Sequence, residues 1–327
     1  MDKIKEKAPK AYFSLISKSR EWGGFQPRLF LYLFDHTIVP ILKHASEVWG
    51  FEEWSVLETL HLKACKYVLS VKSTTNTDAV YSELGRVSLQ KYQHVKILKF
   101  YSRLCNLETN RYASKAFNML LYDAESNKVN WVSKARNLQS IYEFQNSDNN
   151  EIIKYKVREN FATEIRNKLN IHISEDKKLK LYASFKSSFK FECYLDLISD
   201  FNIRSALAKL RLSAHNLHIE TGRFNKNKTP RNERFCLYCK KQSSLEVEDE
   251  IHFLMVCPLY KTERSNMLQA IYRTFPNTEV LSNEIMFFWL MSQEQGDFIK
   301  LIGKFCKKSF QIRKKFLSSP NSTIDLG

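Results

Sequence analysis

Four residues in the C-terminal half of the chain have the types and the spacing of a metal site. Cys236 and Cys239 are three residues apart, twelve residues follow, and His252 and Cys257 are five residues apart. Cysteines at this spacing fit one tight turn and direct both sulfurs to a point about 2.3 Å away. The His and the Cys can return from a turn or short helix to complete a tetrahedron. Three thiolates and one imidazole leave no open position, so the pattern predicts a structural zinc site and disfavours metal-assisted hydrolysis.

The same residues have a plainer interpretation as ordinary buried side chains, or as a site that has lost its metal. Three acidic residues, Glu248, Asp249 and Glu250, lie beside His252. One of these carboxylates can accept a hydrogen bond from the imidazole nitrogen that does not bind the metal, which would fix the tautomer. A solvated acidic loop is an equally good interpretation.

The charge of the chain favours a polyanionic partner. Lys and Arg total 51 against 35 Asp and Glu, a net charge of +16 over 327 residues. Nucleic acid is the commonest partner of such a chain, and anionic membrane is the next. No membrane span is expected, because the first apolar stretch, 29–42, is interrupted by Asp35, His36 and Pro40. The charged first ten residues do not read as a secretory signal, and the seven cysteines are an odd number, which favours a reducing compartment, nucleus or cytoplasm.

The segment that leads into the first two zinc ligands is strongly basic. Between residues 202 and 241, ten Lys and Arg stand against two Glu, a local charge of +8. The stretch 223–234 resembles a phosphate-binding strip, and Tyr238 either stacks on a base or packs around the zinc module. The residues of this segment predicted to contact RNA or DNA are Arg223, Lys226, Lys228, Arg231, Arg234, Tyr238, Lys240 and Lys241.

A second basic cluster occupies residues 300–315, which contain no acidic residue. Apolar residues recur between its charges at helical spacing, so an amphipathic helix is predicted that packs its apolar side. Its charged side either contacts nucleic acid or is only solvated.

The composition predicts a mainly α fold. Gly and Pro are scarce, at 8 and 7, and the stretches between them have helical spacing of apolar residues. Helices are expected over 3–20, from 27 to about 40, and over 52–71, 89–104, 151–169 and 201–212. The polar run 145–150 is the clearest linker.

These elements suggest five segments. We expect a helical bundle over 1–110, further helices over 111–200, and a basic segment with the zinc module over 201–265. Amphipathic helices over 266–316 and a disordered tail over 317–327 complete the prediction.

Two stretches resemble a known family. TIVPILKHASEVWGFEEWSVLETLHLKACKYVLSV, followed by VYSELGRVSL, is similar to the region just beyond the polymerase palm of non-LTR retrotransposon reverse transcriptases. LAKLRLSAHNLHIETGRF, RFCLYC and VEDEIHFLMVCPLY are similar to the C-terminal zinc-binding segment of the same proteins. The two matches occur in the family's order and extend from about residue 11 to residue 260.

The resemblance implies a thumb-like helical region, a linker and a zinc module that helps to hold template RNA or target DNA. It places the zinc ligands on the same four positions, Cys236, Cys239, His252 and Cys257. Arg211 and His215 match the family's RLSAHNL-type segment, which implies that they contact nucleic acid. Other parts of a retrotransposon ribonucleoprotein are the further partners that it implies.

The chain also departs from the family. Lys43-His44-Ala45 stands where the family usually has Leu-Tyr-Gly, which suggests drift in an otherwise apolar helix. The polymerase needs paired aspartates for its two metal ions, and this sequence has no Asp-Asp pair. We therefore expect no polymerase or endonuclease activity from the chain alone.

The sequence thus predicts a zinc-stabilised, RNA- or DNA-binding fragment of a non-LTR retrotransposon reverse transcriptase that is not itself an enzyme. Two alternatives remain. One is a non-catalytic part of an RNA-directed DNA polymerase that acts only with a palm supplied in cis or in trans. The other is a domain recruited for protein–protein contact.

Overall fold

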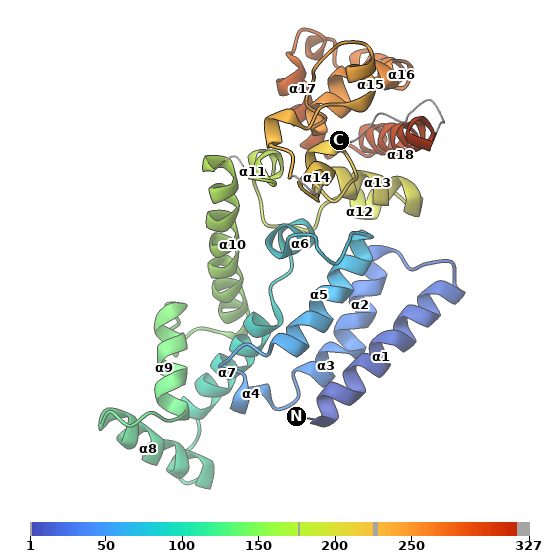
Figure 1. The fold of residues 1–327 in the computed structure, drawn as a ribbon. Coiled ribbons are helices and arrows are strands. Elements are labelled where there is room, and N and C mark those ends of the chain that lie inside the picture. Colours follow the sequence, from blue (N-terminus) through green and yellow to red (C-terminus); the bar gives the residue numbers. More distant parts are fainter. Residues whose placement is uncertain (1, 176, 225–227, 319–327) are drawn as a thin grey trace. The chain divides into compact units, whose positions relative to one another are not determined.

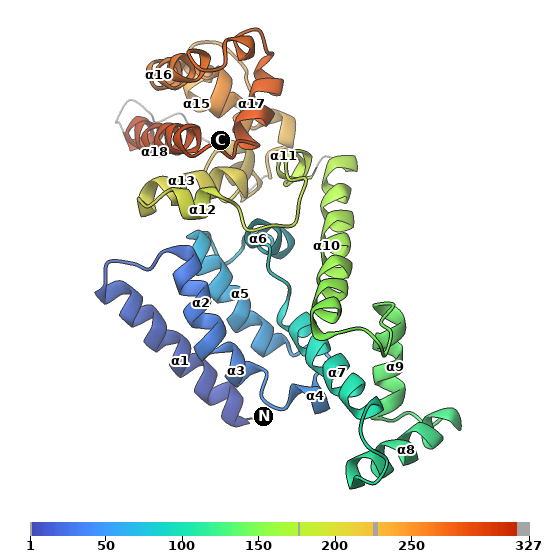
Figure 2. The same cartoon turned by 180° about the vertical axis from the view of Figure 1, so that it is seen from behind.

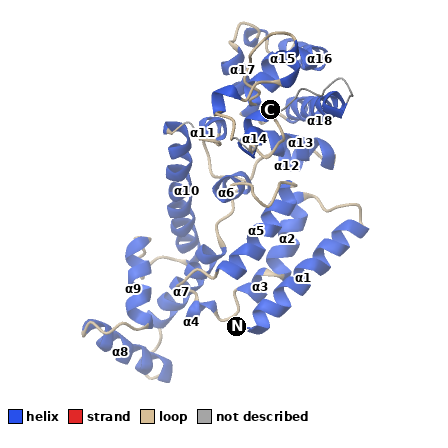
Figure 3. Cartoon of the chain, in the orientation of Figure 1, coloured by secondary structure: helices blue, strands red, loops and turns tan. Residues whose placement is uncertain are grey.

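The mainly α fold predicted from the sequence is confirmed. The computed structural model describes residues 2–175, 177–224 and 228–318, and in this part of the chain helices joined by loops account for the fold, with no strand (Figure 3). The α-helices are α1 (Asp2–Glu21), α2 (Pro27–Thr37), α3 (Val39–Leu42), α4 (Ser46–Trp49), α5 (Ser55–Leu69), α6 (Thr77–Leu84), α7 (Leu89–Cys105), α8 (Tyr112–Glu125), α9 (Trp131–Ile141), α10 (Asn150–Ser174), α11 (Lys180–Phe185), α12 (Tyr194–Leu197), α13 (Phe201–Arg211), α14 (His218–Thr221), α15 (Leu237–Lys241), α16 (Lys261–Tyr272), α17 (Asn283–Met291) and α18 (Gly296–Ser318). Short 3-10 turns are η1 (Gly222–Phe224), η2 (Arg231–Glu233), η4 (Pro258–Tyr260) and η5 (Pro276–Thr278), and η3 (His252–Val256) is a π-helix.

Local signals explain the ends of some helices. Gly23 and Gly24, which follow α1, have φ angles of 76° and 98°, a region that glycine adopts without steric cost. Asn130 caps α9, since its side chain accepts a hydrogen bond from the Ser133 backbone N–H and the Ser133 hydroxyl accepts one from the Asn130 N–H. In the described residues no helix combines the length and the apolar character that a bilayer crossing requires.

The chain forms two compact units. The first consists of 1–25, 29–65 and 84–168, and the second of 26–28, 66–83 and 169–327. The division into five sequence segments stays a prediction. Of the expected tail, Leu317 and Ser318 belong to α18, and residues 319–327 lie outside the described part of the chain.

The first unit has its core around α7, which packs against α4, α8 and α9 (Figure 2). The shared feature of this core is a mixture of aliphatic and aromatic side chains contributed by α7 to α10 and the loops between them: Ile97, Leu98, Tyr101, Phe117, Val132, Ala135, Leu138, Tyr142, Phe144, Ile153 and Val157. Helical spacing places these residues on inward faces, so burial of apolar area stabilises the arrangement.

The second unit is organised by α18, which packs against α12, α13 and α16 (Figure 1). Its apolar side is buried, as the amphipathic pattern predicts. Gly303 allows the close approach to α13, because a Cβ atom there would lie 2.6 Å from the Ile203 side chain. The metal-site segments described below pack onto this helix.

Lys43, His44 and Ala45 lie in the turn between α3 and α4, not within a helix as the sequence suggests. Ala45 adopts a left-handed conformation, with φ of 52°. Glycine, which the resembling family usually has here, adopts this conformation readily, whereas the Cβ of alanine meets a steric cost of about 1–2 kcal/mol. The departure from the family pattern therefore puts a strained residue into this turn.

Ala45→Gly should raise the free energy of unfolding of the first unit by about 0.5–1 kcal/mol. The relief of the left-handed strain exceeds the extra entropy that glycine has in the unfolded chain. Urea denaturation measures the change. Ala116→Gly on the exposed side of α8 is the matched control, and should lower stability by about 1 kcal/mol. An equal loss in both variants would contradict the strain argument.

Candidate metal centre

The first two predicted ligands lie at the start of a short helix. Phe235 pairs with Val247 in an isolated antiparallel bridge, and the Cys236 N–H donates to the Glu246 carbonyl at 2.7 Å. Helix α15 begins directly after Cys236, so Cys239 follows one turn later. This turn brings both thiols to the same side of the segment.

The other two ligands lie at the ends of the π-helix η3. The Cys257 N–H donates to the His252 carbonyl at 2.8 Å, a hydrogen bond that spans five residues. A regular α-helix turns by about 100° per residue and would separate positions five apart by about 140° around its axis. The wider turn lets His252 and Cys257 face a common point, and Pro258 follows at once to end it.

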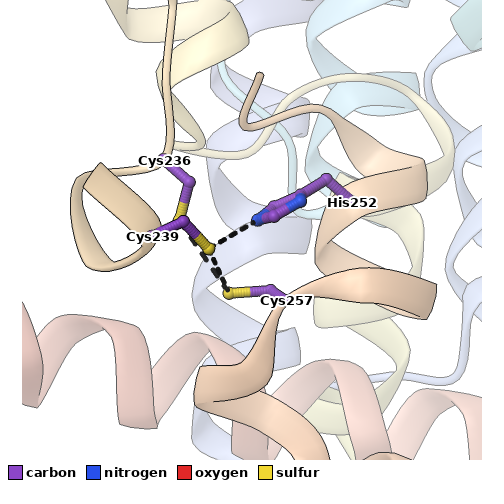
Figure 4. Close-up of side chains that lie close together, drawn as sticks. All are labelled: Cys236, Cys239, His252 and Cys257. Carbon is purple, nitrogen blue, oxygen red and sulfur yellow. Dashed lines mark hydrogen bonds between the residues drawn. The ribbon is translucent and has the colours of Figure 1, made fainter. Parts of the chain in front are cut away.

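The four side chains converge (Figure 4), and all are buried. The Cys236 and Cys257 sulfurs are 3.8 Å apart, those of Cys239 and Cys257 are 3.9 Å apart, and Cys239 Sγ is 3.5 Å from His252 Nε2. A tetrahedral ion about 2.3 Å from sulfur and about 2.0 Å from nitrogen requires S···S and S···N separations of about 3.8 and about 3.5 Å. The cluster therefore has the dimensions to hold a metal ion.

The ionisation of the thiols also fits a cation site. A hydrogen bond from Cys257 lowers the pKa of Cys236 to about 4. Burial and the negative charge on Cys236 raise the pKa of Cys239 to about 11, and the hydrogen bond to Cys236 raises the pKa of Cys257. Since one thiolate hinders the next, a divalent cation is needed to make all three sulfurs anionic together.

The neighbouring acids do not act as the sequence suggests. Glu248 and Glu250 are buried, so they do not form a solvated loop, and His252 Nδ1 has no hydrogen-bond partner among the described residues. Asp249 instead accepts a hydrogen bond from the His252 backbone N–H at 2.7 Å. These carboxylates position the metal-site segment, and none of them accepts a hydrogen bond from the His252 imidazole.

Each buried glutamate connects the segment to the rest of the second unit. Glu250 accepts hydrogen bonds from the Ser213 hydroxyl at 2.7 Å and pairs with His215 Nε2 at 3.0 Å. Glu248 receives two hydrogen bonds from the Arg313 guanidinium on α18, at 2.7 and 2.6 Å. The sequence does not reveal these roles, because the partners Ser213, His215 and Arg313 are remote from the acidic run 246–250 in the chain.

Phe253, which follows His252, is fully buried. Its ring stacks on Phe310 at 4.7 Å between centroids and meets Tyr260 at 4.9 Å and Phe305 at 5.8 Å. The metal segment therefore shares an aromatic core with α18, which provides the apolar burial that so short a module lacks by itself.

Three of the residues predicted to contact nucleic acid use their donors within the protein. Arg211 is buried and paired with Glu83 at 2.6 Å and with Glu192 at 3.0 Å, and His215 is buried against Glu250. Arg234 donates to the Thr229 and Ile219 carbonyls at 2.9 and 2.6 Å. These hydrogen bonds hold the fold together, and a contact of the three residues with nucleic acid stays a prediction.

The remaining predicted contacts lie nearer the surface. Arg223 pairs with Glu220 at 3.0 Å, and Arg231 and Tyr238 are half-buried. Lys228, Lys240 and Lys241 are exposed, and Lys226 lies outside the described residues. Tyr238, Lys240 and Lys241 all belong to α15, the helix that begins after Cys236 and contains Cys239.

Comparison with protein-family models, curated proteins and solved structures finds no match for this chain.

Metal-free protein should bind one Co²⁺ per chain, with the absorption of a tetrahedral thiolate site. The ligand separations above admit four-coordination and leave no position for water. Cys236→Ser and Cys239→Ser should each abolish these bands. Cys105→Ser, which removes a half-buried thiol outside the cluster, is the control and should leave them unchanged. Octahedral spectra, or equal loss in all three variants, would contradict the assignment.

Arg211→Ala should destabilise the second unit by about 3–5 kcal/mol, because it leaves the Glu83 carboxylate buried without its partner. Thermal and urea unfolding measure the loss. Arg20→Ala on the exposed face of α1 should change stability by less than about 0.5 kcal/mol. If Arg211→Ala has the same stability as the control but binds nucleic acid more weakly, Arg211 contacts nucleic acid, as the resemblance implies.

Proposed function

We propose that this protein binds nucleic acid through a zinc-stabilised module, and that it derives from the C-terminal part of a non-LTR retrotransposon reverse transcriptase. The observation that carries the proposal is the position of exposed lysines on α15, the helix that begins at one metal ligand and contains the next. A metal ion that orders α15 would therefore also fix the positions of these lysines.

Zinc is the ion that the donor set favours. Three thiols and one imidazole are soft and borderline ligands, which suit zinc far better than the hard cations Mg²⁺ and Ca²⁺. With all four positions filled by protein, the ion would act in structure: Cys236 and Cys239 would hold α15, and His252 and Cys257 would hold the turn before α16. We propose no chemistry at the ion itself.

The charge supports a polyanionic ligand. Of the basic residues on α18, Lys307, Lys308 and Arg313 pair with Asp200, Glu263 and Glu248, at 3.2, 3.1 and 2.6 Å. Lys300, Lys304, Lys314 and Lys315 have no carboxylate within ion-pair distance in the described residues, and all are exposed on the helix that packs against the metal segment. Exposed lysines of this kind contact phosphates and release counterions.

The retroelement origin is supported by residues outside the metal site. Ala45, at the position where the resembling family usually has glycine, adopts a left-handed conformation that glycine prefers. We propose a binding role without catalysis, since the sequence has no Asp-Asp pair of the kind that the polymerase reaction requires.

Binding to RNA and DNA oligonucleotides should weaken steeply with salt. The slope of the logarithm of the binding constant against the logarithm of the salt concentration should become shallower by about 0.7–0.9 for each phosphate contact that is removed. The variant Lys240→Gln/Lys241→Gln should therefore show a slope shallower by about 1.4–1.8, measured by fluorescence anisotropy between about 50 and about 200 mM salt.

The control for this experiment removes two charges elsewhere. Lys7 and Lys115 are exposed on α1 and α8, so Lys7→Gln/Lys115→Gln tests the effect of net charge alone. A slope unchanged in both variants would place the contacts outside α15. No salt-dependent binding by the zinc-loaded wild-type protein would favour the protein-interaction alternative.

A further inference from the structure

Two aromatic rings meet on the surface of the metal module. Tyr238 lies on α15 between the ligands Cys236 and Cys239, and Phe316 lies in the last turn of α18. Their centroids are 5.5 Å apart with an interplanar angle of 74°, and both side chains are half-exposed. One ring therefore stands nearly edge-on to the other, and part of each remains open to solvent.

This pair is not the core of the module. That role belongs to Phe253, Tyr260 and Phe305, which are buried at 0%, 2% and 2% exposure. Leaving two further rings partly in water forgoes part of the burial energy that their packing would provide. The exposed part of the two neighbouring rings offers flat apolar surface to a ligand.

One ammonium contacts one of the rings, and further lysines are close to them in sequence. The Lys241 ammonium lies 5.3 Å from the centroid of the Phe316 ring, a cation–π contact. Lys240 is next to it in α15, and Lys314 and Lys315 precede Phe316 in α18. Among the described residues, Lys240, Lys314 and Lys315 have no carboxylate within ion-pair distance, so this platform, formed by Tyr238, Phe316 and the four lysines, is complementary to an anion that also carries flat apolar groups.

Single-stranded nucleic acid has this chemistry. Its bases expose their faces, whereas a duplex hides them in its stack, and its backbone supplies a phosphate at every step. An anionic peptide or lipid lacks the regular alternation of flat rings and phosphates.

We infer that Tyr238 and Phe316 stack unpaired bases of a single-stranded RNA or DNA while the lysines of this platform contact its phosphates. This inference rests on the proposed nucleic-acid function and specifies the form of the ligand. The metal ion would orient the platform, because Tyr238 stands between two of its ligands.

The test separates bases from phosphates. Zinc-loaded full-length protein is titrated with oligo(U), with oligo(dT) and with the same backbones carrying abasic sites, which keep the phosphates and remove the rings. The variants are Tyr238→Leu and Phe316→Leu, with Tyr238→Phe as the substitution that keeps a ring. Tyr122→Leu, at an exposed tyrosine of α8, is the matched control. Metal content and circular dichroism verify that each variant is folded.

Each leucine variant should weaken binding of the intact oligonucleotides by about five- to a hundred-fold, as expected for the loss of one stacked base. Tyr238→Phe and Tyr122→Leu should bind within about two-fold of wild type. On abasic strands, wild type should bind at least as weakly as each leucine variant binds intact strands, because both stacked bases are then missing. Comparison of oligo(U) with oligo(dT) then decides between RNA and DNA.

Two outcomes would overturn the inference and leave the proposed function standing. In one, the leucine variants bind intact strands as wild type does. In the other, the leucine variants lose affinity by the same factor for intact and for abasic strands, which would indicate a structural role for the rings. If wild type binds no strand even at low salt, the proposed function fails as well, and the failure is recognised before any variant is compared.

Discussion

The second unit contains a buried cluster of four side chains that could hold a metal ion, and the mutual repulsion of its thiolates is the constraint on which this site depends. Three thiols and an imidazole lie within 4.8 Å of one another, and ionisation of one thiol raises the pKa of its neighbours. A divalent cation removes this conflict by stabilising every thiolate at once. The segment 235–247 contains little apolar material, whereas Phe253 and Tyr260 of the segment 252–260 are buried, so a bound ion would tie the polar segment to this aromatic core. The helix α15 and its surface residues would then be ordered as a consequence of metal coordination.

A second constraint is the positive charge of the chain. Basic side chains in a folded interior require hydrogen-bond acceptors, and the second unit supplies carboxylates at Glu83, Glu248 and Glu250, which hold Arg211, Arg313 and His215. Breaking a buried pair of this kind costs far more than losing a surface pair. The basic residues are therefore divided into those that hold the fold and those that remain available at the surface, and neighbours in sequence fall into different groups.

The two constraints meet at the end of α18. Arg313 reaches inward to Glu248, beside the metal segment, while Lys314 and Lys315 are exposed and Phe316 lies against Tyr238. The same turn of α18 therefore contains Arg313, which holds Glu248 of the metal segment, and Phe316, which belongs to the platform that we propose for single-stranded nucleic acid. A change in metal occupancy would be transmitted to that surface through Tyr238, which lies between two ligands.

The sequence by itself determined the helical fold and the four-residue metal cluster, and it predicted the limits of only some of the helices. Helical periodicity and Cys/His spacing are local properties, and they survive folding with little change. It did not determine which basic residues are free to contact a ligand. Arg211 and Arg231 are equivalent in the sequence, but in the structure Arg211 is buried and paired with Glu83 and Glu192. Nor did the sequence pair Tyr238 with Phe316, which are remote in the chain. Only tertiary structure decides such contacts, since they depend on how distant helices pack against one another.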